Sequence, residues 1–244
     1  PFCNLIHFEK QVGRRKEDQL NQPKLLIVAP MSGHHATLLR GTVRDMLPHA
    51  DITITDWLDA RDVPQSEGGF DLHDYIDTVI HHFHTLGKNT HVMAVCQPSV
   101  PVMAAVAIMN ARGDEYAPKS MTLIGGPIDT RESPTEVNQL AKEKPLKWFK
   151  EKVVTTVPMN YPGFMRQVYP GFLQLRGFLN MNLDRHCESY AKYYQNLLKE
   201  DKTAAQSHEK FYENYNAVMD MTAEFYLQTI DRVFKKAEIA NNAM

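Results

Sequence analysis

A strand, a sharp turn and a helix are predicted in one short run, His91-Val92-Met93-Ala94-Val95-Cys96-Gln97-Pro98-Ser99-Val100-Pro101. Residues 92–95 form a short apolar run, which predicts a strand buried inside a sheet. Pro98 suits the first turn of a helix, because its missing N–H would have no partner there. We expect this helix to continue to Arg112 and to stop at Gly113. Cys96 is therefore predicted to lie at the corner between strand and helix.

A cysteine at such a corner is in the position of a nucleophile. In α/β-hydrolases the pattern Gly-x-Ser-x-Gly holds a reactive serine on a sharp turn after a strand. The corresponding residues here are Ala94-Val95-Cys96-Gln97-Pro98, so Cys replaces Ser, and Ala and Pro replace the two Gly. A helix N-terminus stabilises a thiolate, which is the nucleophilic form. The alternative is a buried structural cysteine, which is common in protein cores.

Composition sets broader bounds. The chain has 244 residues, 43% of them hydrophobic, and a net charge of −2, which gives no reason to expect a nucleic-acid partner. Its three cysteines, Cys3, Cys96 and Cys187, are far apart and odd in number, which argues against a disulfide framework. No apolar run is long enough to cross a bilayer, and residues 1–4 are not a signal peptide. The first residue is not Met, so we expect a piece of a longer chain.

The first 130 residues alternate strands with helices. This order predicts an α/β fold with a mostly parallel sheet and helices on both faces. Residues 2–8 give a further strand with mixed faces, and residues 11–23 a surface connection. The four buried strands are expected at 25–29, 52–55, 92–95 and 121–124, and the helices at 36–46, at 71–86 and after Cys96.

The pattern changes near residue 130. We expect no strand after Ile124, and we divide the chain into an incomplete hydrolase core at 1–130 and a helical cap or lid at 131–244. Two amphipathic helices are predicted at 184–200 and 204–237. The aromatic residues between them and the core either line a groove for an apolar chain or pack the cap against the sheet. They are Tyr161, Phe164, Tyr169, Phe172 and Phe178.

Several segments together resemble one family. They are Val28-Ala29-Pro30-Met31-Ser32-Gly33-His34, Thr55-Asp56-Trp57, the Cys96 box, Gly125-Gly126-Pro127-Ile128-Asp129-Thr130, Tyr169-Pro170-Gly171-Phe172 and Ala223-Glu224-Phe225-Tyr226-Leu227. The combination is similar to the intracellular poly(3-hydroxybutyrate) depolymerases, bacterial α/β-hydrolases with a cysteine nucleophile. The likeness covers essentially the whole chain.

The resemblance implies hydrolysis of ester bonds in stored polyhydroxyalkanoate granules in the cytoplasm, with no cofactor and no metal. Cys96 would attack the ester carbonyl and form an acyl-thioester, which water hydrolyses. The backbone N–H groups of Gln97 and Ser32 are the expected oxyanion donors, with Met31 as the alternative to Ser32. The expected partner is a polyester granule or an oligomeric hydroxyalkanoate ester, with no nucleic acid and no membrane span.

The sequence departs from this family at its C-terminal end. The acid and base of the triad follow the nucleophile in this fold, and in the family they lie beyond the position that matches Met244. We therefore expect the acid and base to lie outside this sequence, on a missing C-terminal segment or a second chain. The piece alone would be inactive and would expose an unpaired sheet edge.

Residues inside the sequence offer weaker candidates for these roles. Asp129 follows a strand on the side of the nucleophile, although a turn aspartate is the simpler interpretation. His34 and His35 lie near the oxyanion turn and are expected at the surface or along the pocket. Cys187 adjoins His186, but neighbours on a helix point apart.

Other functions stay open at this point. A polyhydroxyalkanoate synthase or a thioester hydrolase also uses Cys on this fold, although synthase boxes carry Gly where Ala94 and Pro98 stand. A non-catalytic granule-associated protein is the third possibility. The sequence does not distinguish the preferred side-chain length of the polyester, the oligomeric state, or water from coenzyme A as the acyl acceptor.

Overall fold

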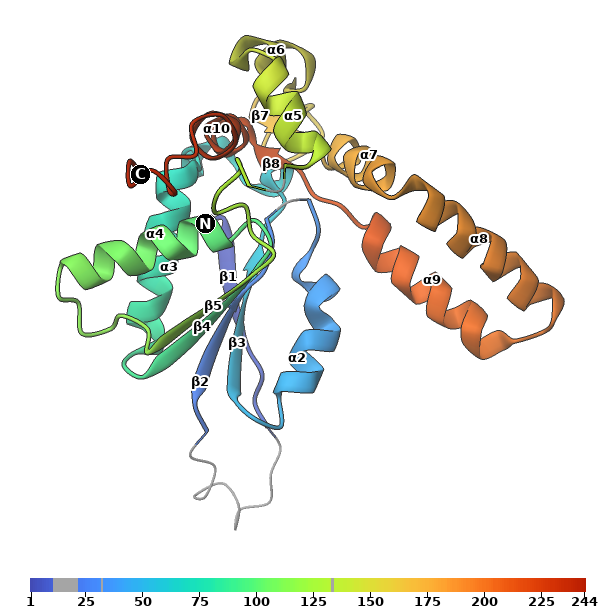
Figure 1. Cartoon of the computed structure of the whole chain (residues 1–244), viewed down its shortest axis with the longest axis horizontal. Coiled ribbons are helices and arrows are strands. Elements are labelled where there is room, and N and C mark those ends of the chain that lie inside the picture. Colours follow the sequence, from blue (N-terminus) through green and yellow to red (C-terminus); the bar gives the residue numbers. More distant parts are fainter. Residues whose placement is uncertain (11–21, 32, 133) are drawn as a thin grey trace.

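A five-stranded, mostly parallel sheet forms the centre of the molecule (Figure 1). The structure is a computed structural model that describes residues 1–10, 22–31, 33–132 and 134–244. The strand order is β1-β3-β2-β4-β5. Strand β1 runs antiparallel to β3, and the other neighbours are parallel. The strands are β1 (Cys3–His7), β2 (Lys24–Val28), β3 (Asp51–Trp57), β4 (Thr90–Val95) and β5 (Ser120–Ile124).

Helices cover both faces of this sheet, as an α/β fold requires. A 3₁₀ turn, η1 (Ala36–Leu39), leads into α2 (Arg40–Met46) on one face. On the other face α3 (Leu72–Leu86) packs against α4 (Ser99–Ala111). Two short 3₁₀ turns, η2 (Ala60–Asp62) and η3 (Gln65–Glu67), connect β3 to α3. The predicted fold class is confirmed, and the predicted strand at 2–8 is present. The predicted connection at 11–23 lies mostly outside the described residues.

Local signals explain where the core elements begin. The Asp71 carboxylate accepts hydrogen bonds from the amides of His73 and Asp74, and the Asp74 carboxylate accepts one from the Asp71 amide, which forms a capping box. At the end of β2, the Ala29 amide donates to Thr55 Oγ1 at 2.9 Å, and the Ala29 carbonyl accepts from Trp57 Nε1 at 2.9 Å. These side chains of β3 fix the direction in which the chain leaves β2.

A second, small sheet corrects the prediction that no strand follows Ile124. Its strands are β6 (Thr155–Thr156), β7 (Gln167–Tyr169) and β8 (Met221–Thr222), in antiparallel order. Strands of two or three residues are too short to give an alternating pattern, so the sequence carries no signal for them.

The predicted continuous helix at 204–237 is also wrong. Helix α9 (Lys202–Asn216) ends, the chain extends through β8, and α10 (Ala223–Gln228) then runs into a π-helix, η4 (Thr229–Lys235). The interruption has a physical cause. The Met219 amide donates to the Gly33 carbonyl at 2.8 Å and β8 pairs with β7, so this backbone is bonded to other segments instead of to its own helix.

Two copies of Tyr-Pro-Gly-Phe bring the chain very close to other backbone. A Cβ on Gly163 would lie 2.7 Å from the Arg61 carbonyl oxygen, and a Cβ on Gly171 would lie 2.7 Å from that of Met219. Both contacts are closer than a side chain allows. The repeated motif therefore fastens residues 158–171 to the loop after β3 and to the segment before β8.

Residues 1–130 and 131–244 share one core. Met219, Met221, Phe225 and Val233 are buried in the same cluster as the sheet residues. Helices α5 (Glu136–Glu143) and α6 (Leu146–Lys152) pack mainly on η4 and α10 at the top of Figure 1.

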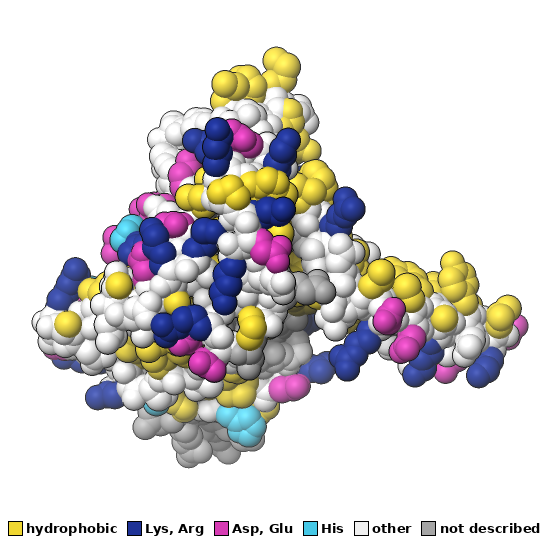
Figure 2. Space-filling view, turned by 45° about the horizontal axis from the view of Figure 1, so that its top comes forward, with side chains coloured by type: hydrophobic (Ala, Val, Ile, Leu, Met, Phe, Trp, Pro, Cys, Tyr) yellow, Lys and Arg dark blue, Asp and Glu magenta, His cyan; other side chains and the backbone are white. Residues whose placement is uncertain are grey.

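A helical arm projects from this body. It consists of α7 (Gly171–Met181), α8 (Leu183–Leu198) and α9, of which α8 and α9 pack on each other (Figure 1). Helix α8 has no buried residue. Hydrophobic side chains show along the arm in Figure 2, and Leu198, at its tip, is 87% exposed. Among the described helices, none combines the length and the apolar character that crossing a bilayer requires.

Strand β5 forms one edge of the large sheet and is poorly covered. Met121 is 36% exposed and Ile124 is 45% exposed, whereas strands of parallel sheets are normally buried on both faces. The predicted unpaired edge with exposed apolar residues is confirmed.

Candidate active site

Cys96 occupies the predicted corner between β4 and α4. Its backbone φ is 69°, in the left-handed region, where a residue with a side chain is strained. The Cys96 amide donates to the Ile124 carbonyl at 2.7 Å, and the Cys96 carbonyl accepts from the Ser99 amide at 3.1 Å. The thiol is free and the residue is exposed, which contradicts the alternative of a buried structural cysteine.

Two glycines after β5 pack directly against this corner. Gly125 has a φ of +62°, and a Cβ on Gly126 would lie 2.2 Å from the Ser99 Oγ and 2.7 Å from the Cys96 carbonyl oxygen. Any side chain at residue 126 would therefore displace the turn. The strained Cys96 backbone is held in place by the close packing of Gly126 and by the hydrogen bond from the Cys96 amide to the Ile124 carbonyl.

The predicted oxyanion donor Gln97 follows β4, and Met31, the alternative to Ser32, follows the neighbouring strand β2. Val28 and Ala94 are register partners in the parallel pair β2–β4, so the turn after β2 and the turn after β4 leave the sheet side by side. The Gln97 amide donates no hydrogen bond to the residues that the structure describes, and Gln97 lines the cavity next to Cys96. Ser32 lies outside the described residues, and the alternative, Met31, is buried at 1% exposure.

A cavity of about 600 Å³ opens beside the thiol. One part of its wall consists of Cys96, Gln97 and the Gly125-Gly126-Pro127 turn, and most of the remaining wall is apolar. Its size lies within the range of about 300–1,000 Å³ that encloses a drug-sized ligand. The other lining residues are Asp129, Thr130, Glu132, Thr135, Val137, Asn138, Leu140, Phe149, Tyr169, Gln174, Gly177, Phe178, Met181, Met221, Phe225, Tyr226, Thr229, Ile230 and Phe234.

Some of the aromatic residues singled out in the sequence line the cavity, and others do not. Tyr169 and Phe178 line the cavity. Tyr161 packs on the small cluster that contains Val157, whereas Phe164 and Phe172 are exposed.

The sequence reasoning missed the part of the wall that comes from α5, α6 and η4. Leu140, Phe149, Ile230 and Phe234 belong to it. Their helical spacing gave a signal for a buried face, but it gave none for which surface that face covers.

Asp129 lines the cavity but is engaged by its neighbour. Arg131 donates to both of its carboxylate oxygens, at 2.7 Å and 2.8 Å, and the Arg131 amide adds a third hydrogen bond at 3.0 Å. These bonds to the charged form lower the pKa of Asp129 to about 2. A carboxylate this acidic is a poor general base, because efficient proton transfer needs a pKa nearer the working pH.

The candidate histidines are not brought to the cysteine. His34 is buried, its Nε2 donates to the Tyr215 carbonyl at 3.0 Å, and burial lowers its pKa. His186 bonds to the Tyr212 hydroxyl on the arm, where Cys187 is exposed. Neither His34 nor His35 lines the cavity, and within the described parts of the chain no histidine does.

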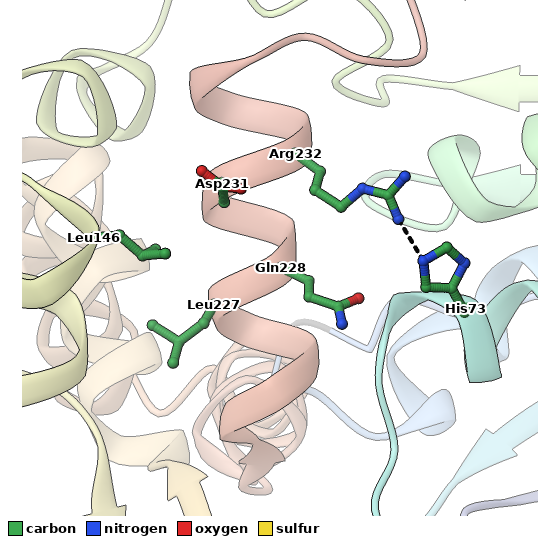
Figure 3. A pocket seen from close by; sticks show the side chains of 6 residues that line it. All are labelled: His73, Leu146, Leu227, Gln228, Asp231 and Arg232. Carbon is green, nitrogen blue, oxygen red and sulfur yellow. Dashed lines mark hydrogen bonds between the residues drawn. The ribbon is translucent and has the colours of Figure 1, made fainter. Parts of the chain in front are cut away.

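A second hollow lies around the start of η4 and is drawn in Figure 3. Arg232 Nη1 bonds to His73 Nε2 at 2.7 Å, and Arg232 Nε pairs with Glu238 at 2.6 Å. Gln228 bonds to both Asp71 and the Leu72 amide. These groups are engaged with each other and join α10 and η4 to the start of α3. The contacts around this hollow therefore stabilise the part of the cavity wall that α10 and η4 form. The polar groups that make them are already hydrogen-bonded to each other.

The comparison with protein families bears on the same wall. Residues 125–244, which contribute every cavity residue except Cys96 and Gln97, match the family model described as PHB de-polymerase C-terminus. This matched segment belongs to the family of that model. The match begins at Gly125, in the turn that packs against Cys96, so it includes most of the cavity wall but not the nucleophile box.

Two solved structures are similar to this chain at low identity. N-formylmaleamic acid deformylase from Pseudomonas putida is 14% identical with a TM-score of 0.38, and the match covers 61% of this chain and 56% of that one. The Vlm2 thioesterase domain is 13% identical with a TM-score of 0.39, covering 59% of this chain and 58% of that one. No curated protein matches the chain significantly.

Proposed function

We propose that this protein is an intracellular polyhydroxyalkanoate depolymerase, a carboxylic ester hydrolase whose nucleophile is Cys96. The observation that carries the proposal is an exposed thiol on a left-handed corner that opens into a largely apolar cavity. Strain of this kind at a reactive side chain is typical of functional sites. The family match of the cavity wall supports a polyester as the substrate.

The proposed reaction has two stages. The Cys96 thiolate attacks an ester carbonyl carbon, and the negative charge that develops on the carbonyl oxygen is held by the Gln97 amide and an amide of the turn after β2, at Ser32 or Met31. Collapse of this intermediate breaks the C–O bond, and the leaving alkoxide takes a proton to become a hydroxyl end. Water then attacks the Cys96 thioester, releases a carboxylic acid and returns the thiol.

The base of this proposed reaction is not assigned to a histidine of the cavity, because none of the described histidines lines it. Asp129 is a weak candidate because of its bonds to Arg131. The proposed location is the cytoplasm, at the surface of storage granules.

The decisive experiment compares Cys96→Ala with Cys187→Ala in the full-length gene product. Both replace an exposed free cysteine, but Cys187 lies on the arm. On amorphous polyhydroxybutyrate granules we expect Cys96→Ala to reduce hydrolysis by about 10³-fold or more, as removal of a nucleophile does, and Cys187→Ala to retain wild-type activity.

Three outcomes would contradict the proposal. Equal activity of Cys96→Ala and the parent would exclude the nucleophile. Polymer formation from hydroxyacyl-coenzyme A would indicate a synthase instead. Granule binding without hydrolysis by the parent protein would indicate a non-catalytic granule protein.

A further inference from the structure

Two tyrosines stand together in the cavity wall. Tyr169 ends β7 and Tyr226 belongs to α10, and these two elements contact each other. Their ring centroids are 4.0 Å apart with an interplanar angle of 32°, and both rings line the cavity that contains Cys96. Both residues also pack against the main core, so the rings are held in place from behind.

The two phenols are protonated and have no partner within the described residues. Burial raises the pKa of Tyr169 to about 12, and burial together with the neighbouring Tyr169 raises the pKa of Tyr226 further. Both residues are partly exposed, and neither hydroxyl is among the enclosed polar atoms without a partner. The two O–H groups are therefore available as donors to a ligand in the cavity that both residues line.

Several other polar groups of the wall are already engaged. Thr130 Oγ1 donates to the Val233 carbonyl, and Asn138 Nδ2 donates to the Thr130 carbonyl. Gln174 Nε2 donates to the Tyr169 carbonyl at 3.2 Å. Thr229 Oγ1, also in the wall, is buried without a partner in the described residues, so the tyrosine pair supplies two of the uncommitted hydroxyls of the wall.

The cavity also defines the charge of its ligand. Within the described chain, no lysine or arginine lines it, whereas Asp129 and Glu132 do. An anionic ligand would find no countercharge there. A neutral ligand that offers acceptors and apolar surface satisfies these conditions, and an aliphatic polyester chain consists of such groups, because its repeating unit has a carbonyl oxygen and no N–H.

We propose that Tyr169 and Tyr226 form a carbonyl-binding subsite, which holds the ester unit adjacent to the unit that Cys96 attacks. The subsite rests on the proposed depolymerase function and deepens it. It gives the enzyme a preference for oligomeric esters over esters with a single acyl unit, because only an oligomer supplies a second carbonyl.

The test uses variants that remove one oxygen and keep the ring. Tyr169→Phe, Tyr226→Phe and the double variant are compared with Tyr190→Phe, whose ring lies on the arm. Binding of a 3-hydroxybutyrate trimer, used as its neutral methyl ester, is measured by calorimetry in the full-length protein that also carries Cys96→Ala, so that no turnover occurs. A neutral hydrogen bond contributes about 0.5–1.5 kcal/mol, so we expect each variant to weaken binding about 2- to 12-fold, and Tyr190→Phe to have no effect.

A kinetic comparison separates binding from structural damage. With Cys96 intact, kcat/KM is measured for the trimer and for p-nitrophenyl butyrate, which has one acyl unit. We expect the double variant to lose about tenfold more on the trimer than on the single-unit ester. Equal losses on both esters, or unchanged trimer binding, would overturn the subsite. If the parent protein hydrolyses neither ester, the proposed function fails, while the binding measurement still decides whether the tyrosines hold the trimer.

Discussion

The corner at Cys96 and the arm formed by α8 and α9 are held in opposite ways. At the corner, β4 lies between β2 and β5, and a glycine turn presses on the strained residue from the side. In the arm, α8 and α9 pack mainly on each other, with smaller contacts from α9 to η1 and from α8 to α7, and none of the residues of α8 is buried.

Within the arm, stabilisation comes from aromatic rings stacked between the two helices. His208 stacks on Tyr193 with ring centroids 4.4 Å apart, and Tyr212 contacts both Tyr190 and His186. Such pairs contribute about 0.5–1.5 kcal/mol each beyond the area that they bury. The geometry at the thiol therefore depends on packing between segments that are distant in the sequence. The arm is stabilised mainly by contacts between its own neighbouring helices, so we expect it to be less stable.

The largest expected effect tests the core that packs on the large sheet. Phe83, on α3, is fully buried in the main core. Phe83→Ala should lower the free energy of unfolding by about 3–5 kcal/mol, because it removes apolar contacts and leaves a cavity. Denaturant unfolding measures this change. A loss below 1 kcal/mol would mean that the core is much less tightly packed than the structure shows.

A titration of protein stability against pH tests the same core. His82, also on α3, is 5% exposed, and neither ring nitrogen has a partner in the described residues. Burial, with a smaller contribution from His81, lowers its pKa from 6.5 to about 4. Below pH 6.5 the unfolded chain therefore binds a proton that the folded chain resists, so stability present above pH 6.5 is lost as the pH falls toward 4.

The size of this effect is about 3 kcal/mol over that range, at 1.36 kcal/mol for each unit of pKa difference. His82→Leu should remove it, and the variant should lose correspondingly less stability than the parent between pH 6.5 and 4. Parallel stability curves for the two proteins would contradict the prediction.

The smallest effect concerns the arm. Tyr212 is 5% exposed and bonds to His186, whereas Tyr194 is 65% exposed. We expect Tyr212→Ala to destabilise the arm by about 1–2 kcal/mol, and Tyr194→Ala to change stability by less than about 0.5 kcal/mol. Amide hydrogen exchange should accelerate in α8 and α9 while β4 stays protected. Faster exchange in β4 would show that the arm is not a separate unit.

Local sequence signals were sufficient for the corner but not for the cavity. The apolar run before Cys96 and Pro98 after it act within a few residues, so they predicted β4, the turn and α4. The exposed thiol agrees with the nucleophile interpretation. The oxyanion assignment to Ser32 stays a prediction, because that residue lies outside the described part of the chain.

The wall opposite the thiol depends on contacts between distant segments. Phe149 and Ile230 meet in one buried cluster although they are far apart in the sequence. Their spacing indicated an apolar face without indicating its partner. Strands β6, β7 and β8 were missed for a related reason, since pairing with each other is what makes such short segments strands.

The exposed edge at β5 limits what can extend the large sheet. A strand that joins β5 in parallel must arrive through a crossover of a dozen or more residues, usually with a helix. That helix would lie over the side chains of β5 that now face solvent, among them Met121. A lone peptide could pair with the edge but could not supply this cover, whereas a folded βα unit would do both. Until one does, concentrated solutions of this chain should associate edge to edge.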